Sequence, residues 1–142
     1  MELPIKLADI QKLIPQKDPI IMVSALEAYH EMALQSSFLI SEDCLFIWAD
    51  HLTESGLIEH MAQSVALHTG YSYYLRNLSA PLGYIGSIPR VEIAALPRVG
   101  QTLHTQVQII QEFMGVTLVE IITKLEGEII ANAQMKTVIA GM

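Results

Sequence analysis

One long helical pattern, followed by strand patterns to the end of the chain, restricts this sequence to few architectures. Residues 56–75 favour a helix with one apolar side, made by Leu57, Ile58, Met61, Ala62, Val65, Ala66 and Thr69. Thr53, Glu54 and Ser55 precede this segment as N-cap candidates. The chain is β-rich after Pro81, so a single helix has to pack against a sheet.

The strand patterns after the helix are separated by turn residues. The extended segments are residues 82–94, 102–113, 116–125 and 128–139. Residues 97–100, Met114-Gly115 and Glu126-Gly127 have turn chemistry. The last two turns are short, so we expect the strands on either side of them to form antiparallel hairpins.

The N-terminal part gives weaker patterns. Residues 7–14 have apolar positions at helical spacing, and Pro15 prevents continuation of that helix. Residues 19–23 and 32–40 are extended candidates that would form a hairpin, with polar residues 29–31 between them. Residues 41–55 lack periodicity and are interpreted as a connecting loop with one turn of helix at most. The sum is an α+β fold in one domain, residues 1–142.

Composition excludes several classes of protein. Hydrophobic residues make up 51% and charged residues 16%, which is too apolar for a disordered chain and indicates that some apolar surface faces another subunit. A net charge of −7 without a basic run disfavours nucleic-acid binding. Apolar runs fall far short of the roughly 20 residues that span a bilayer, so no membrane span is expected.

Compartment and cofactor expectations follow from what the sequence lacks. The first residues have no signal-peptide pattern, so we expect a cytoplasmic protein. Cys44 is a lone cysteine and can make neither an internal disulfide nor a Cys-x-x-Cys zinc site. There is no Gly-rich phosphate loop of the dinucleotide-binding or Walker type. We therefore expect no metal and no organic cofactor.

Five short motifs, in order, resemble those of the 3-hydroxyacyl-ACP dehydratases. Residues 15–23 resemble the family's Pro-His-x-x-Pro-Phe-Leu-Leu-Val-Asp stretch, and residues 59–63 (Glu-His-Met-Ala-Gln) resemble its Glu-Ala-Met-Ala-Gln helix. Residues 84–90, 96–103 and 126–133 resemble its next strand, its Pro-Gly corner and its closing hairpin. The resemblance implies a hot-dog fold, a curved antiparallel sheet wrapped around one long central helix, and at least a dimer.

Departures from the family pattern point to a divergent branch. The family's Gly-His-Phe-Pro motif, which carries its catalytic histidine about 14 residues before the helix glutamate, is absent. The histidine nearest to that position is His51, eight residues before Glu59. Gln16 and Ser24 stand where the family has His and Asp. The branch resembles dehydratase-like proteins of aryl-polyene and flexirubin-type pigment assembly.

The resemblance implies dehydration of 3-hydroxyacyl thioesters held on the phosphopantetheine of an acyl-carrier protein, or on CoA. That reaction needs a base, an acid and stabilisation of the thioester oxygen. Glu59 lies at the edge of the apolar stripe, where desolvation would raise its pKa and suit it as the acid, and Gln63 lies one turn on to orient it, both flanking an apolar tunnel. The alternative is that Glu59 only stabilises the first helical turn.

The other site residues each have a structural alternative. His51 is a candidate base, with its loop donated to a partner subunit's helix, or else a solvated surface group. The N–H groups of Gly56 and Leu57 are candidates to hold the thioester oxygen, or else are capped by Thr53 or Ser55. Arg90 is slightly favoured over Lys17, Arg76 and Arg98 for a pantetheine phosphate or an acidic carrier, because of its position in the motif, whereas most of these cations are expected to be ordinary surface charges.

Two further histidines lie on the predicted helix. His60 falls opposite the apolar stripe, so we expect it to face solvent or another subunit. His68 lies on the apolar flank, which indicates a core or interface histidine.

Three functions remain open from the sequence. The first is a homodimeric 3-hydroxyacyl-ACP dehydratase. The second is a non-catalytic hot-dog subunit that binds an acyl chain or pairs with an active dehydratase, because the family's histidine motif is missing. The third is an acyl thioesterase in which Glu59 activates water.

Overall fold

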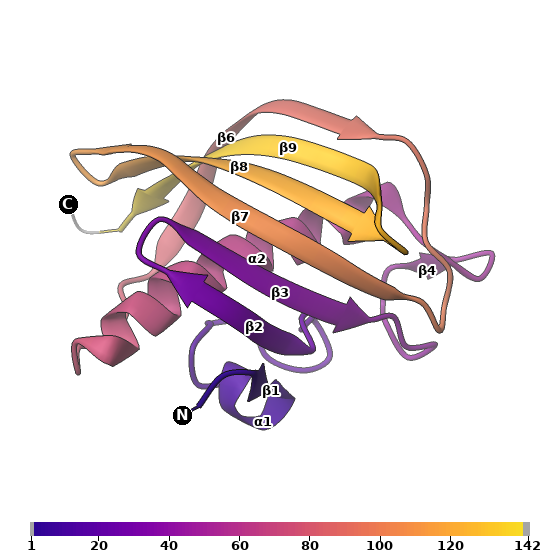
Figure 1. The fold of residues 1–142 in the computed structure, drawn as a ribbon, viewed down its shortest axis with the longest axis horizontal. Coiled ribbons are helices and arrows are strands. Elements are labelled where there is room, and N and C mark those ends of the chain that lie inside the picture. Colours follow the sequence, from indigo (N-terminus) through magenta and orange to yellow (C-terminus); the bar gives the residue numbers. More distant parts are fainter. Residues whose placement is uncertain (1, 141–142) are drawn as a thin grey trace.

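A curved antiparallel sheet wraps around one long helix (Figure 1). The computed structural model describes residues 2–140, and its seven-stranded sheet has the order β1-β2-β3-β7-β8-β9-β6. In chain order the elements are β1 (Ile5–Lys6), α1 (Leu7–Ile10), β2 (Ala25–His30), β3 (Ala33–Leu39), β4 (Ile47–Trp48), β5 (His51–Leu52), α2 (Glu54–Leu75), β6 (Gly83–Ile93), β7 (Thr102–Phe113), β8 (Val116–Leu125) and β9 (Glu128–Ile139). The predicted α+β architecture is confirmed.

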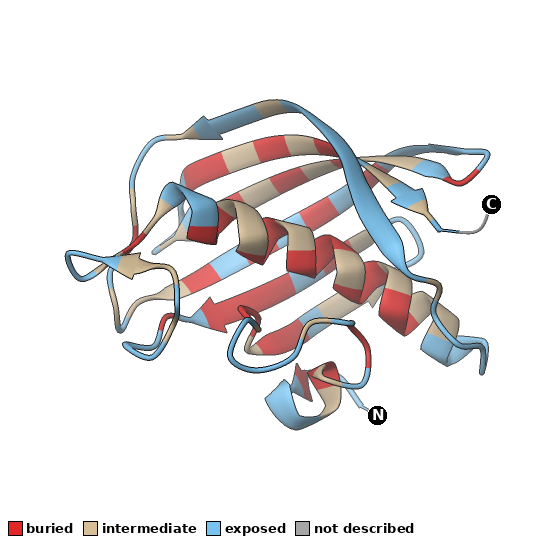
Figure 2. Ribbon diagram, turned by 180° about the vertical axis from the view of Figure 1, so that it is seen from behind, coloured by how far each residue is buried: buried red, intermediate tan, exposed pale blue. Residues whose placement is uncertain are grey.

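Helix α2 begins two residues before the predicted start and ends where predicted. Its N-cap is Thr53, whose Oγ1 accepts a hydrogen bond from the Gly56 N–H at 3.2 Å. Toward the C-terminal end of α2, Gly70 packs directly against the backbone of Leu13, because a Cβ at this position would lie 1.9 Å from the Leu13 carbonyl oxygen. Buried residues recur along α2 and along the sheet face turned toward it (Figure 2), so the core lies between helix and sheet.

The C-terminal strands match the predicted segments closely. β7, β8 and β9 have the predicted bounds, and β6 begins one residue later and ends one residue earlier than its predicted segment. Both hairpin turns use left-handed backbone, with positive φ at Met114, Gly115, Glu126 and Gly127. Residues of β7 alternate between buried and exposed positions, as expected for a sheet with one face on a helix.

The prediction of a strand at residues 19–23 is wrong. Side chains of α2 satisfy this backbone in place of a sheet neighbour: the Gln63 amide bonds to Ile20 O and Met22 N, and His60 bonds to Met22 O. We call residues 20–22 the clamped loop. The strand begins instead at Ala25, so the expected turn residues 29 and 30 belong to β2.

Two other N-terminal expectations need correction. The first helix ends at Ile10 rather than residue 14. Residues 41–55 are not a plain loop, because β4 and β5 pair as a small hairpin, separate from the main sheet. Ala49 and Asp50 both have positive φ and make its two-residue turn.

The expectation that His60 faces solvent or another subunit is wrong, because this side chain is fully buried. The clamped loop and the sheet cover that side of α2. His60 Nδ1 donates to Met22 O at 2.7 Å, Nε2 bonds to Thr105 Oγ1 at 2.7 Å, and Thr105 Oγ1 bonds to Thr123 Oγ1 at 2.8 Å. Burial lowers the pKa of His60 to about 4, so the ring is neutral near pH 7.

His68 is buried, as expected for a core or interface histidine. Its Nε2 bonds to the carbonyl oxygen of His30 at 3.0 Å, and its ring stacks on Tyr29. Among the described residues, no helix is long and apolar enough to cross a membrane.

Candidate active site around Glu59

A cavity of about 310 Å³ lies beside α2 and contains Glu59 in its wall. Its other walls come from β6, β8, β9 and the segment before the clamped loop. The lining residues from these elements include Gln16, Glu59, Val65, Tyr84, Ile85 and Val138. Most of the wall is apolar, so the cavity suits an acyl chain with a polar group held near Glu59.

Gln63 fixes the Glu59 carboxyl group. Its Nε2 donates to Glu59 Oε1 at 2.9 Å and to Ile20 O at 3.0 Å, and its Oε1 accepts from the Met22 N–H at 2.6 Å. Both amide hydrogens of Gln63 are thus used. The expected contact between Gln63 and Glu59 is present, but Gln63 is fully buried and does not line the cavity. Its substrate-binding role stays a prediction, and its position fits orientation of Glu59.

Glu59 is half-buried, and one of its sides faces the apolar cavity. Thr53 caps the helix six residues before Glu59, and Glu54 supplies a negative charge in the first turn. Stabilisation of the helix start therefore does not depend on Glu59. This placement supports a chemical role for the carboxyl group.

His51 lies outside the Glu59 cavity, in the β4–β5 hairpin. Its Nδ1 donates to Ala49 O at 2.7 Å, and its Nε2 accepts from Arg98 Nε at 3.4 Å. Among residues 2–140, no histidine lines the cavity of Glu59. The structure does not bring His51 and Glu59 together within one subunit, so a base role for His51 stays a prediction that requires a second subunit.

Thr53 bonds to both proposed thioester-oxygen donors. The Gly56 N–H points to Thr53 Oγ1, and the Leu57 N–H donates to Thr53 O at 2.9 Å. Gly56 is also closely packed, since a Cβ there would lie 2.5 Å from Leu52 Cδ1. The capping interpretation describes both groups in this structure, and thioester binding by Gly56 and Leu57 stays a prediction.

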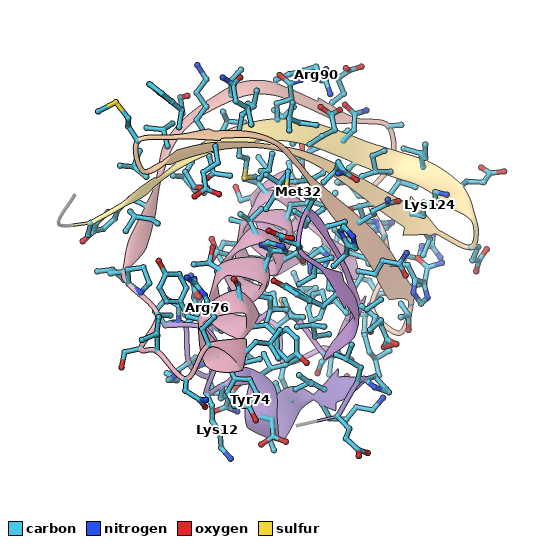
Figure 3. The ribbon with its side chains drawn as sticks, turned by 60° about the vertical axis from the view of Figure 1, so that its left-hand side comes forward. Lys12, Met32, Tyr74, Arg76, Arg90 and Lys124 are labelled. Carbon is cyan, nitrogen blue, oxygen red and sulfur yellow. The ribbon has the colours of Figure 1, made fainter. Side chains whose placement is uncertain are left out.

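Arg90 points away from α2 on the outer side of the sheet (Figure 3). Its guanidinium group pairs with Glu120, and its Nε lies 3.5 Å from Glu92 Oε1. Gln134, between them on β9, donates to the other oxygen of Glu120 at 3.0 Å. Arg90 is therefore engaged in a polar row remote from the cavity wall, and phosphate binding by this residue stays a prediction.

Gln16 is the site residue that the sequence analysis missed. It lines the same cavity as Glu59, and its Oε1 is buried without a hydrogen-bond partner. The signal was present, because Gln16 stands where the resembling family has His. The sequence showed only that Gln16 replaces this histidine, and it gave no information about which residues Gln16 would contact.

Metal chemistry has no obvious donor set here. Within the part of the chain that the structure describes, no group of three or more His, Cys, Asp or Glu side chains is arranged to hold a metal ion. The polar groups of the cavity instead suit hydrogen bonding and proton transfer.

The curved sheet, the central helix and the acyl-sized cavity beside it define a hot-dog-fold protein. Hot-dog proteins form a broad class, and a family model narrows it. The model of the ApeP-like family, described as ApeP dehydratase, matches residues 8–140. The chain therefore belongs to the ApeP-like dehydratase family. Comparison with curated protein sequences gives no match.

Solved structures confirm the fold. A chain of the dehydratase heterocomplex ApeI:P from Xenorhabdus doucetiae has a TM-score of 0.87 at 18% identity, covering 99% of this chain and 93% of that chain. An uncharacterised protein from Pyrococcus horikoshii has a TM-score of 0.71 at 12% identity, covering 99% and 97%. The PaaI protein of the E. coli phenylacetic acid degradation operon has a TM-score of 0.65 at 10% identity, covering 80% of each chain.

Proposed function

We propose that this chain dehydrates 3-hydroxyacyl groups carried on the phosphopantetheine of an acyl-carrier protein, as a subunit that supplies Glu59 and the acyl cavity. The observation that carries the proposal is the Glu59 carboxyl group, held by Gln63 at the wall of an apolar cavity. Membership of the ApeP-like dehydratase family supports the reaction class. The enzyme is expected to work in the cytoplasm without metal or organic cofactor.

Glu59 acts as the general acid in this proposal. A base removes a proton from C2 of the acyl chain, the C2–C3 double bond forms, and the C3–O bond breaks. The leaving hydroxyl group takes the proton of Glu59 and departs as water. An acid of this kind contributes about 10²–10⁴-fold to the rate of such reactions.

The base is expected to come from a second subunit. No histidine of the described residues lines the cavity, but one of its walls is β6, whose outer edge has no neighbouring strand in the described sheet. β6 also exposes Tyr84, Ile85, Ile88 and Val91. A subunit packed on this edge would cover apolar surface and close the cavity. In a homodimer, His51 of the second copy is the proposed base.

The decisive experiment measures water loss by mass spectrometry from a panel of 3-hydroxyacyl carrier proteins. We expect Glu59→Gln and His51→Ala each to lower the rate by about a hundredfold or more. Glu54→Gln is the matched control, because Glu54 is exposed on the same helix and should leave the rate unchanged.

Mixing the two inactive variants tests the shared site. A mixed dimer of Glu59→Gln and His51→Ala subunits contains one site with both native residues, so partial activity should return. If the mixture stays inactive while wild type is active, His51 does not serve the partner's Glu59, and the base must be sought elsewhere.

A non-catalytic subunit is the second candidate, and the cavity without a histidine favours it. The solved relative from Xenorhabdus doucetiae is a chain of a dehydratase heterocomplex. If the folded chain on its own removes water from no substrate of the panel, but raises the activity of a dehydratase partner, this second function is correct and the homodimeric enzyme is excluded.

A further inference from the structure

The Gln16 side chain holds a buried hydrogen-bond acceptor that the fold itself does not use. Its Oε1 is inaccessible to solvent and has no hydrogen-bond partner. Gln16 lies in the wall of the Glu59 cavity. A buried polar atom without a partner costs free energy, so we expect the Gln16 amide to rotate this oxygen toward a molecule that enters the cavity, whose wall Gln16 lines.

Neighbouring groups do not supply that partner. Pro15 has no N–H to give. Lys17 directs its Nζ to the carbonyl oxygens of Ile14, at 2.8 Å, and Gln11. Gln63, the other glutamine at the site, uses its whole amide within the fold. Of the two glutamines at this site, Gln16 is therefore the one whose amide oxygen is left for a ligand.

A hydroxyl group suits the pair of polar groups in this cavity. Glu59 in its acid form donates a hydrogen bond, and Gln16 Oε1 accepts one. A hydroxyl group both accepts and donates, so it matches the donor of Glu59 and the acceptor of Gln16 in the same cavity. A keto group only accepts, and a methylene group does neither, so both would leave the Gln16 oxygen without a partner.

We propose that Gln16 is a specificity-determining residue that accepts a hydrogen bond from the 3-hydroxyl group of the acyl substrate. The inference rests on the proposed function, because it takes a 3-hydroxyacyl group as the occupant of the cavity. It goes further by naming the residue that distinguishes this group from 3-oxoacyl and saturated acyl groups of equal length.

Binding measurements test this role without any need for turnover. The probes are 3-hydroxyacyl, 3-oxoacyl and saturated acyl pantetheine amides, in which nitrogen replaces the thioester sulfur and slows elimination. Isothermal titration of the full chain should give a Kd for the 3-hydroxyacyl probe at least about tenfold lower than for either of the others. Such a ratio corresponds to one good hydrogen bond.

Gln16→Met keeps the side-chain length and removes the amide. We expect the 3-hydroxyacyl preference to fall to about one, while the Kd for the saturated probe changes less than about threefold. The saturated probe thus reports whether the variant still folds and binds, and Gln16→Leu repeats the measurement with a second side chain. Gln111→Met is the matched control, because Gln111 is exposed on β7 outside the cavity and should keep the wild-type preference.

Two results would overturn the inference. One is an unchanged 3-hydroxyacyl preference in Gln16→Met and Gln16→Leu. The other is a wild-type preference for the 3-oxoacyl probe, which would mean that Gln16 donates rather than accepts. Failure of the proposed function looks different, because a chain that never releases water but prefers the 3-hydroxyacyl probe through Gln16 retains the inference.

Discussion

Acidification should destabilise this protein through His60. The ring is fully buried, stacks on Phe38 and bonds to Met22 O and Thr105. Because Met22 O can only accept, Nδ1 carries the proton, and the neutral ring accepts at Nε2 from the Thr105 hydroxyl group. Protonation would place a charge where no solvent reaches, and this desolvation lowers the pKa of His60 from 6.5 to about 4.

The sign of the pH effect follows from that lowered pKa. Well above pH 6.5, His60 is unprotonated in both the folded and the unfolded chain, so its full contribution to the free energy of unfolding is present. As the pH falls from 6.5 toward 4, the unfolded chain is protonated first and gains stability relative to the folded chain. Between about pH 7.5 and about pH 4.5, this group should remove about 2–3 kcal/mol from the free energy of unfolding.

Urea unfolding of wild type and His60→Gln at both pH values isolates the effect. Glutamine can donate to Met22 O and accept from Thr105, but it does not titrate. Contributions of the other titrating groups, including His68, are shared and cancel in the comparison, provided that protein concentration is the same. We expect the free energy of unfolding of wild type to fall by about 2–3 kcal/mol more than that of His60→Gln on acidification. If the losses in free energy of unfolding of wild type and His60→Gln differ by less than about 1 kcal/mol, the argument that His60 is held neutral by burial is refuted.

Two further predictions concern helix α2. Thr53→Ala should lower the free energy of unfolding by about 1 kcal/mol, because the Gly56 N–H loses its cap. Ser55→Ala, at an exposed position, should change it by less than about 0.5 kcal/mol. Chemical denaturation measures both changes. Gly70→Ala should lower the free energy of unfolding by about 1–3 kcal/mol or more, because the added Cβ would overlap Leu13 O. A thermal melt should show a lower Tm. Gly83→Ala, whose Cβ would lie 3.7 Å from its nearest neighbour, is the control, and an equal loss there would contradict the packing argument.

The C-terminal half of the fold was predictable because its signals are local. The hairpin turns at Met114-Gly115 and Glu126-Gly127 are read from adjacent residues, and they set the bounds of three strands. The single helix was equally clear from its periodicity. The clamped loop was not, because its backbone is satisfied by side chains about 40 positions later in the chain. A local pattern of apolar β-branched residues at 19–23 cannot reveal such distant partners.

The site was predictable in part. The Glu59–Gln63 contact follows from helical spacing of four residues, and the structure contains it. The position of His60 was misread because a single apolar stripe assumes that the opposite side of a helix meets water. Here residues from the clamped loop, β3 and β7 surround α2, so a polar side chain on the opposite side is buried with partners from three segments. The pairing of Arg90 with Glu120 depends on sheet order, which the sequence did not supply.

The full use of the Gln63 amide limits how this protein can change over evolution or under redesign. Asparagine at this position is one methylene shorter, and glutamate offers no N–H to Ile20 O or to Glu59. Either replacement would disturb the clamped loop and the acid together. A change at position 63 therefore alters the support of the loop backbone and the orientation of Glu59 at once. A side-chain change in the loop cannot compensate, because the contacted atoms, Ile20 O and Met22 N, belong to the backbone.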